Sequence, residues 1–455
     1  MSGLGRSLAL GASAVLLVAA AAPAAVADQR DPGCGDDGRS VRYLVVFDQG
    51  TAEDVAAGQV AAACGATSVY YPEIGVGVVR SADPGFAAKF GPDRAFSAQQ
   101  VRRGGAAVRA ELPDAAGVSG EDRTGEQWNL AAIDAGPRAG SPDVVVGVLD
   151  SGIDPSQPDL AKAVDAEDSA GCLTGVSDRS PAAWQPTTSA HGTHVAGIIA
   201  AADDGKGITG VAPGVRVASV KVLNDRGYVD PEAAVCGLMW AAERHLRVVN
   251  ASFAVDPWGV SCSQRRGFAV VREAIARAVQ YSTAQGTLTV TAATNEAADL
   301  TPVRPDAAPS GCEELPAGLR DAVTVSAVGR DEVKAGYSSY GLGVVDLAAP
   351  GGTHGDCVLS TVPGGYAPMC GTSMAAPHVA GVAALVASAH PGFGPRQLSA
   401  ALYRGARPLA CPDDYDLTGD GHQDAFCTGY TGYNGFYGHG MVDAAGGAVS
   451  SVAAG

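Results

Sequence analysis

Beyond about Gln127, runs of apolar residues alternate along the chain with segments of helical periodicity. Strands that are apolar throughout are buried on both faces, which is typical of a parallel sheet covered by helices. The pattern therefore predicts an α/β fold with a parallel β-sheet and helices on both of its faces. The apolar runs are 143–149, 215–222, 247–252 and 287–293, and the segments read as helical after them are 191–202, 231–243, 267–285 and 321–328.

Four polar residues fall where such a sheet places its chemistry, beyond the carboxyl ends of strands and at the starts of helices. Asp150 follows the first apolar run and Asn295 follows the fourth. His191 and Ser373 each begin a helical segment. Each residue alone has a structural interpretation, because Asp and Asn form turns and Ser caps helices. The His191-x-x-His194 pair also suggests a metal site, although the two side chains face different directions on a helix.

The segment Gly371-Thr372-Ser373-Met374-Ala375-Ala376-Pro377 is the most informative. Small residues surround the serine, and a proline in the first helical turn loses no hydrogen bond because those amides have no partner within the helix. A helix start also offers backbone N–H groups and a positive dipole end to a developing oxyanion. A nucleophilic role for Ser373 fits this position.

The segments around Asp150, His191 and Ser373 resemble three signatures of the subtilisin family, in that family's order, and the resemblance covers residues 127–455. It implies a serine endopeptidase in which Ser373 is the nucleophile and forms an acyl-enzyme, His191 is its general base, and Asp150 orients the histidine. It also implies that the side-chain amide of Asn295 donates to the oxyanion.

The segment Ser252-Phe253-Ala254 resembles the strand on which this family binds substrate. There the peptide is added as a β-strand, through its main chain. Ala254 stands where a glycine is usual in the family, and so does Thr294, the residue before Asn295. Both add a methyl group near the implied pocket for the substrate side chain, so we expect that pocket to be altered or narrowed.

The N-terminal part predicts a secreted precursor. Residues 1–27 have the charged, apolar and small-residue regions of a signal peptide. Residues 28–105 contain strand patterns at 43–47, 65–71 and 76–80 and a helical pattern at 52–64. This small α+β, ferredoxin-like domain resembles the inhibitor-like propeptide of subtilases, which implies an intramolecular inhibitor. Within the aperiodic stretch 95–124, residues 106–126 are expected to be a cleavable linker before the catalytic domain, 127–455.

Ten cysteines in an exported chain indicate disulfides, and because none stands in a CxxC pair, zinc is not expected. The connectivity is left open by the sequence. The pairs that the spacing suggests are Cys34 with Cys64, Cys262 with Cys312, Cys357 with Cys370, and Cys411 with Cys427.

The formal net charge of −17 argues against a nucleic-acid or anionic-membrane partner, since both require a basic face. We expect protein or peptide substrates, an extracellular monomer released from the membrane once the signal peptide is removed, and chemistry that needs no cofactor. Structural calcium is a hypothesis, because Asp159 and Asp204 match positions of the family's calcium site, although a solvated acidic loop is the alternative. The loop 416–424 resembles the first part of an EF-hand, but Cys427 stands where the closing acidic ligand belongs.

Two alternatives remain at this point. A dedicated processing protease, in the manner of mycosins, would have a narrow substrate set. A catalytically inactive subtilase fold would serve as a binding module, but such a chain is expected to have lost at least one of Asp150, His191, Asn295 or Ser373, and all four are present.

Overall fold

The computed structural model describes residue 1 and residues 33–102, 116–117, 120–257, 267–302, 313–353 and 355–449. The chain divides into the units Met1–Cys34 and Gly35–Gly455, and all elements below belong to the second. Residues 2–27 of the predicted signal peptide, most of the predicted linker, and the predicted Cys262–Cys312 pair lie outside the described residues.

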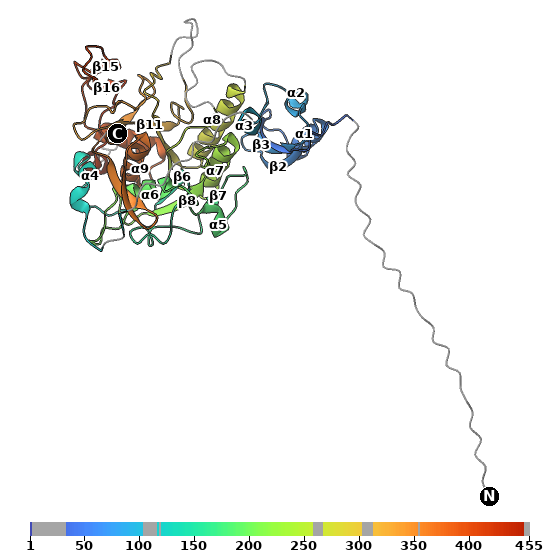
Figure 1. Ribbon diagram of the computed structural model, residues 1–455, viewed down its shortest axis with the longest axis horizontal. Helices are drawn as coiled ribbons and strands as arrows, with labels where there is room; N and C mark the ends of the chain where they lie inside the picture. Colours follow the sequence, from blue (N-terminus) through green and yellow to red (C-terminus); the bar gives the residue numbers. More distant parts are fainter. Residues whose placement is uncertain are drawn as a thin grey trace. The chain divides into compact units, whose positions relative to one another are not determined.

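The largest element is a seven-stranded sheet in which every pair of neighbouring strands is parallel, and it confirms the predicted sheet (Figure 1). Its strands, in order across the sheet, are β12 Leu347–Pro350, β11 Ala322–Val328, β10 Leu288–Ala292, β9 Val248–Ala251, β6 Val145–Asp150, β8 Arg216–Lys221 and β7 Ala170–Gly171.

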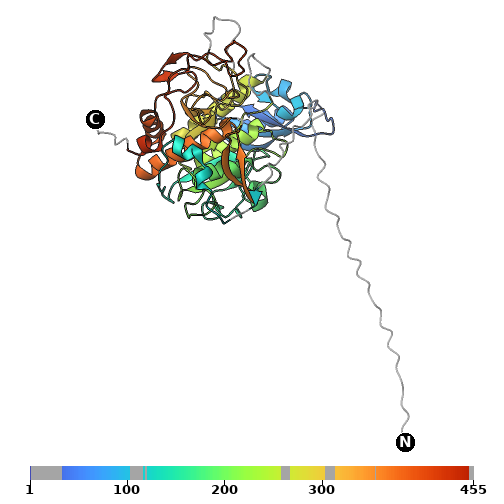
Figure 2. The same ribbon diagram turned by 60° about the vertical axis from the view of Figure 1, so that its left-hand side comes forward.

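Helices cover both faces of this sheet, and β6 shows why. Successive side chains of a strand point to opposite faces. Val146 and Val148 pack in a core with α6 (His191–Ala200) and α9 (Thr372–Ala389), whereas Val145 and Leu149 pack with α7 (Pro231–Glu243) and α8 (Phe268–Ala284). Figure 2 shows α9, in orange, running through the interior. The helix α9 is long and apolar enough to cross a membrane, but 83% of it is buried inside the protein, as expected of a core helix.

One sequence-based prediction is wrong. The segment 321–328 was expected to continue the helical pattern, but it forms strand β11, Ala322–Val328, between β10 and β12. All seven residues are buried, and most are Val or Thr. Because β-branched side chains favour strands, and because a short apolar run has the same appearance in a buried helix and in a buried strand, periodicity alone misassigned it.

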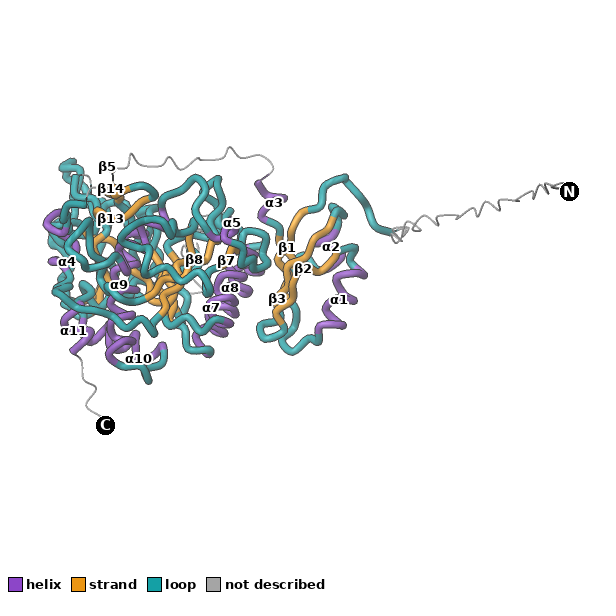
Figure 3. Tube along the Cα trace, turned by 90° about the horizontal axis from the view of Figure 1, so that it is seen from below, coloured by secondary structure: helices purple, strands orange, loops and turns teal. Residues whose placement is uncertain are grey.

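The predicted small α+β unit is present. Its antiparallel sheet has the order β2-β3-β1-β4, and α1 and α2 lie on one face, where their side chains form a separate core with those of β1 (Figure 3). The first residues of the aperiodic stretch 95–124 are folded, since they form β4 and α3 and bury Phe96. The elements are β1 Val41–Val46, α1 Glu53–Ala62, β2 Ala66–Tyr71, β3 Val76–Ser81, α2 Phe86–Phe90, β4 Ala95–Phe96 and α3 Ala98–Val101.

The remaining elements are short or lie near the C-terminus. They are β5 Ala116–Gly117, a 3-10 turn Thr124–Glu126, α4 Trp128–Ala132, α5 Pro181–Trp184, β13 Val358–Val362, β14 Gly365–Met369, α10 Pro395–Gly405, β15 Gly429–Tyr430, β16 Tyr433–Asn434 and α11 Ala444–Val449. The strands β13, β14 and β5 form an antiparallel sheet, and β15 pairs with β16.

Disulfides cross-link the described chain at several places, and Cys34 and Cys64 are both disulfide-bonded. The predicted pairs Cys357–Cys370 and Cys411–Cys427 are confirmed. A third disulfide, Cys172–Cys236, joins the residue after β7 to the middle of α7, and the sequence had suggested no partner for either cysteine. The two cysteines are 64 residues apart in the sequence, so their spacing gave no indication that they pair.

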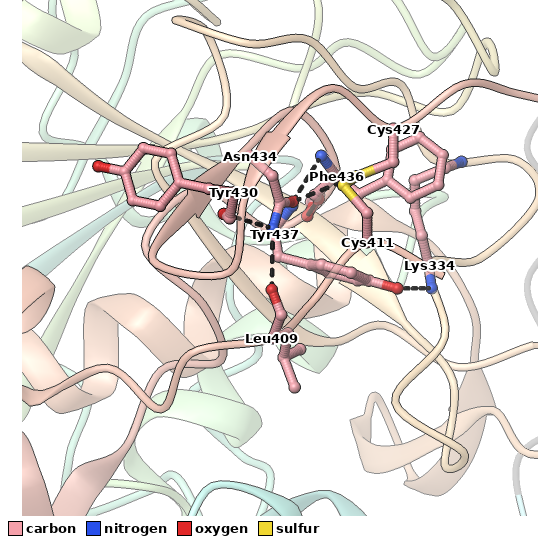
Figure 4. Close-up of a disulfide and its surroundings, with 9 residues drawn as sticks. Lys334, Leu409, Cys411, Cys427, Tyr430, Asn434, Phe436 and Tyr437 are labelled. Carbon is pink, nitrogen blue, oxygen red and sulfur yellow. Dashed lines mark hydrogen bonds between the residues drawn. A yellow bond between two sulfur atoms is a disulfide. The ribbon is translucent and has the colours of Figure 1, made fainter. Parts of the chain in front are cut away.

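The disulfide Cys411–Cys427 lies beside Asn434 (Figure 4). The amide nitrogen of Asn434 donates to the carbonyl oxygen of Leu409 at 2.8 Å, and its side-chain oxygen accepts the backbone N–H groups of Phe436 and Tyr437 at 3.1 and 3.0 Å. One buried asparagine therefore ties the loop after α10 to the loop after β16.

We predict that replacing Cys172 and Cys236 together with alanine lowers the free energy of unfolding by about 4 kcal/mol, since the lost cross-link frees a long loop in the unfolded chain. The matched control is the double alanine variant of Cys411 and Cys427. The disulfide removed there spans only 16 residues, so the free energy of unfolding is expected to fall by about 3 kcal/mol. Denaturant unfolding measures both. A larger loss from the shorter loop would contradict the prediction.

Candidate active site

Three adjacent strands deliver the polar segments singled out in the sequence to one edge of the sheet. β6 ends at Asp150, β9 leads into Ser252, and β10 leads into Asn295, and these strands are neighbours in the order β10-β9-β6. Two helices begin with the other predicted residues, since His191 is the first residue of α6 and Ser373 the second of α9.

Asp150 and His191 are in direct contact. The imidazole Nδ1 of His191 lies 2.8 Å from each carboxylate oxygen of Asp150, which is 2% exposed. The backbone N–H of Ser151 donates to the same carboxylate at 2.6 Å. A side chain on Gly192 would bring its Cβ within 2.5 Å of the carbonyl oxygen of Gly152, so glycine permits this close approach. With Nδ1 donating to Asp150, Nε2 of His191 is left as an acceptor.

Two opposing effects set the pKa of His191. Burial disfavours the imidazolium and by itself lowers the pKa. The negative charge of Asp150 and its hydrogen bond act in the other direction and outweigh burial, so the pKa of His191 is raised above its ordinary 6.5. The contact with Asp150 therefore favours the protonated ring more than burial disfavours it.

Ser373 is held at the start of α9 by contacts with the residue after β9. Its Oγ donates to the carbonyl oxygen of Ser252 at 3.3 Å, and the Oγ of Ser252 donates to the carbonyl oxygen of Ser373 at 3.0 Å. Asn250 in turn donates to the Oγ of Ser252 at 2.8 Å. The hydrogen bonds of the described residues do not include one between Ser373 Oγ and His191 Nε2. Such contacts often tighten only when substrate binds.

Asn295 lies next to the same helix start. Its Oδ1 accepts the backbone N–H of Thr372 at 2.9 Å and the hydroxyl of Thr372 at 2.8 Å. These two donors fix the orientation of the amide, because only oxygen can accept both. The amide nitrogen lies beside the backbone just before α9, where a Cβ on Gly371 would be 3.4 Å from it. Its N–H groups are thus available to an oxygen placed near Ser373.

The predicted substrate segment follows β9 directly. Ser252 and Phe253 are buried, and Ala254 is half-buried. The next N–H, that of Val255, donates to the carbonyl oxygen of Leu315 at 2.9 Å. The segment is therefore fixed at one end by Ser373 and at the other by Leu315.

His194 does not form a metal site with His191. Its Nε2 lies 3.1 and 3.0 Å from the carbonyl oxygens of Val358 and Ala367, and the side chain is fully buried. Burial lowers the pKa of His194 to about 3. His194 is a neutral core residue that joins α6 to the β13-β14 hairpin, in agreement with the predicted divergence of the two rings.

The two residues proposed for calcium have different environments. Asp159 is 5% exposed, and its Oδ2 accepts the N–H of Ile208 at 3.0 Å and the hydroxyl of Tyr366 at 2.9 Å. Asp204 is exposed and caps a turn by accepting the N–H of Lys206 at 3.2 Å. Burial, with a further contribution from the charge of Asp204, raises the pKa of Asp159. A cation near both carboxylates would relieve this effect.

The EF-hand-like loop folds around its own backbone. The carboxylate of Asp416 accepts the N–H groups of Gly419 at 2.7 Å, Asp420 at 3.2 Å and Gly421 at 2.7 Å, and these bonds lower its pKa. Cys427 is in a disulfide and offers no ligand. The described contacts therefore give this loop a structural explanation without an ion.

Sequence reasoning missed one residue at this site, Glu314. It is 3% exposed, and its Oε2 accepts the hydroxyl of Thr294, the residue before Asn295. No motif surrounds Glu314. The signal that could have led to it is Thr294, which stands where the family usually has glycine. A threonine at this position suggests a hydrogen-bond partner for its hydroxyl, and that partner is Glu314.

Comparison with known proteins finds similar chains in one protein family. A family model described as the subtilase family, Peptidase S8, matches residues 141–440. Subtilisin DY of Bacillus licheniformis is 35% identical over 260 residues, which are 56% of this chain and 81% of that protein. Fervidolysin of Fervidobacterium pennivorans is 31% identical over 331 residues, 66% of this chain. The chain spans only 42% of fervidolysin and 47% of alkaline elastase YaB of Bacillus sp. (strain YaB).

Solved structures show the same fold. The epidermin leader peptide processing serine protease of Staphylococcus aureus superimposes with a TM-score of 0.65 at 18% identity, covering 92% of this chain and 100% of that one. The crystal structure of fervidolysin gives a TM-score of 0.62 at 24% identity, covering 90% of this chain and 61% of that one.

We predict that Asp150→Asn lowers the pKa of His191 below 6.5, because the charge that opposes the effect of burial is removed. Titration of the imidazole by NMR measures the pKa. Asp154→Asn is the matched control, since that carboxylate bonds only to Ser156 among the described residues and its loss should leave His191 unchanged. An unchanged pKa in Asp150→Asn would show that the carboxylate does not govern the ring.

Proposed function

The chain belongs to the subtilase family of serine proteases, and we propose that it is a secreted endopeptidase that cleaves peptide bonds of proteins outside the cell. The observation that carries this proposal is the contact of His191 with the buried Asp150 at the sheet edge where Ser373 and Asn295 also lie. Protein substrates are what protease relatives lead us to expect, and the segment Ser252-Phe253-Ala254 is proposed to hold them.

In the proposed mechanism, Ser373 Oγ attacks the carbonyl carbon of the scissile bond while His191 Nε2 accepts its proton. Asp150 stabilises the resulting imidazolium through Nδ1. The tetrahedral intermediate collapses when His191 gives that proton to the departing amine, which leaves an acyl-enzyme on Ser373. A water molecule, deprotonated by His191, then releases the acid and restores the serine.

The negative charge on the former carbonyl oxygen needs donors that are already in place. The amide nitrogen of Asn295 and the backbone N–H at the start of α9 are proposed to supply them. Loss of one such donor costs about 2.7 to 4 kcal/mol of transition-state stabilisation, a magnitude established on a subtilisin and therefore on a relative of this chain. Thr372 supports this role because it holds the oxygen of Asn295 and so turns the nitrogen outward.

We also propose the domain order signal peptide 1–27, propeptide 28–105, linker 106–126 and catalytic domain 127–455, with the propeptide as an intramolecular inhibitor. Contacts between the α+β unit and two helices of the larger part support it. Arg42 pairs with Glu232 of α7 at 2.8 Å, and Arg277 of α8 donates to the carbonyl oxygens of Phe47 and Ile74 at 2.9 and 3.0 Å. The unit thus contacts α7 through an ion pair and α8 through hydrogen bonds from Arg277 to backbone carbonyl groups.

Subtilases need no cofactor for their chemistry, and we propose calcium only as a structural ion. The residues fit in part: Asp159 and Asp204 supply carboxylate oxygens, and carbonyl groups of the loop 202–208 would complete the oxygen shell that calcium requires. In the described contacts Oδ1 of Asp159 accepts no hydrogen bond. Bound calcium would tie this loop to Asp159.

We predict that a fluorophosphonate forms one covalent adduct with the matured, exported protein, and that Ser373→Ala abolishes it. Intact mass measures the adduct. Ser399→Ala on α10 is the control and should label as the wild type does. Absence of the adduct on wild type would favour the alternative of an inactive binding module.

We predict that calcium chelation lowers the melting temperature of the wild-type protein by several degrees, since an ion that binds only the folded chain stabilises it. Asp159→Asn should melt lower and show no further response to the chelator. Asp416→Asn, in the other acidic loop, is the control and should respond as the wild type does. Equal melting temperatures with and without chelator would contradict a calcium site at Asp159.

A further inference from the structure

A buried carboxylate with no cation of its own lies beside the proposed oxyanion site. Glu314 is 3% exposed, and in the described part of the chain no Lys, Arg or His forms an ion pair with it. Its described partner is the hydroxyl of Thr294, which donates to Oε2. Burying a carboxylate is unfavourable unless it is paired or protonated, so this position needs an explanation.

Thr294 makes this contact from a strained backbone conformation. Its φ is +77°, a left-handed conformation that is a genuine outlier for a β-branched residue and is energetically unfavourable. The hydroxyl of Thr294 donates to Glu314 and lies 3.2 Å from the hydroxyl of Ser339. Because Thr294 directly precedes Asn295, it connects the carboxylate to the residue that is proposed to hold the oxyanion.

The backbone next to Glu314 contacts the proposed substrate segment. Its neighbour Leu315 accepts the N–H of Val255 at 2.9 Å, directly after Ser252-Phe253-Ala254. Glu314 therefore lies between the two segments that flank Ser373, one reached through Thr294 and the other through Val255. In the proposed binding mode, the side chain of the residue before the scissile bond, called P1, enters between these two segments.

The electrostatic surroundings favour a cation there. Burial raises the pKa of Glu314 to about 7, the hydrogen bond from Thr294 opposes this, and the charges of Glu296 and Asp256 raise it further. A bound cation would lower this pKa and offset the repulsion among the three carboxylates.

One of the carboxylates that act on Glu314, Asp256, already has a guanidinium beside it. Glu314, Glu296 and Asp256 are called the acidic edge below. Arg102 pairs with Asp230 and lies 3.7 Å from the carboxylate of Asp256, with its charged group 4.3 Å from the centre of the Tyr228 ring. Asp256 is thus both the partner of Arg102 and one of the charges that act on Glu314. The edge can accommodate a guanidinium in contact with the protein.

We propose that Glu314 makes this protease select substrates with lysine or arginine at P1, through an ion pair between the carboxylate and the substrate's cationic side chain. This inference rests on the proposed function and names its substrate class. Thr294 is a positioning residue, because it holds the carboxylate and does not itself need to touch the substrate.

The test uses the matured protein, exported from the full chain, and peptides that differ only in P1: arginine, lysine, norleucine and phenylalanine. We expect kcat/KM for the lysine peptide to exceed that for the nearly isosteric norleucine peptide, and Glu314→Gln to lower this ratio on the order of 100-fold. Glu313→Gln is the matched control, since its carboxylate is exposed and pairs with Arg272, and it should keep the wild-type ratio.

The pH dependence of the same ratio separates an ion pair from a structural role. Comparing two peptides cancels the titration of His191, and kcat/KM reports groups of the free enzyme. The ratio should rise as the pH increases through about 7, where Glu314 loses its proton, and should be flat in Glu314→Gln. Glu314→Asp keeps the charge and should retain a reduced preference, which guards against a glutamine variant that folds poorly.

The outcomes distinguish this inference from the proposed function. Labelling of Ser373 by the fluorophosphonate together with a preference for phenylalanine or norleucine overturns the role of Glu314 and leaves the protease standing. An unchanged lysine-to-norleucine ratio in a labelled Glu314→Gln variant does the same. Absence of both labelling and hydrolysis in the wild type overturns the proposed function, and the inference with it.

Discussion

The register between β6, β9 and β10 is the constraint on which the site depends. Leu149 and Thr291 both pair with Ala251 of β9, so the residues that follow, Asp150, Ala292 and Ser252, lie at one level of the sheet. A slip by one residue would exchange the two faces of a strand, moving Val146 and Val148 out of their core. Burial on both faces therefore fixes the edge at which the candidate active site is assembled.

The helices α6 and α9 bring His191 and Ser373 to the edge formed by the strands. The backbone limits how closely α6 can approach the end of β6. His191 reaches Asp150 because Gly192 has no side chain to meet Gly152. Once docked, the pair satisfies the carboxylate of Asp150, which accepts from both the imidazole and the N–H of Ser151. The same contacts that make burial of this charge tolerable also orient the histidine, so folding stability and the proposed mechanism depend on the same hydrogen bonds.

The sequence was sufficient to predict the positions of residues that lie at strand ends and helix starts. Asp150, His191, Asn295 and Ser373 lie in the predicted elements, because apolar runs and small-residue helix starts are local signals. The strand β11 was misassigned because a short buried run is ambiguous without its neighbours.

Contacts between distant segments were not predictable in the same way. Cys172–Cys236 spans 64 residues, and the burial of Glu314 depends on the loops after β9 and β10. No local pattern around Glu314 distinguishes it from its exposed neighbour Glu313. The glycine position occupied by Thr294 was visible in the sequence, but its partner was not, since twenty residues separate the two along the chain.

A second buried ionisable side chain in this protein, Lys334, has a fuller set of partners, although burial lowers its pKa to about 7. Lys334 is 1% exposed, and its Nζ donates to the carbonyl oxygens of Ala335 at 3.0 Å and Ser338 at 2.8 Å. The same ammonium lies 5.0 to 5.2 Å from the centres of three aromatic rings, so the protein supplies its whole environment. Glu314 has a strained threonine and two further carboxylates instead. No cation among the described residues pairs with Glu314, and for this reason a cationic substrate side chain is proposed as its partner.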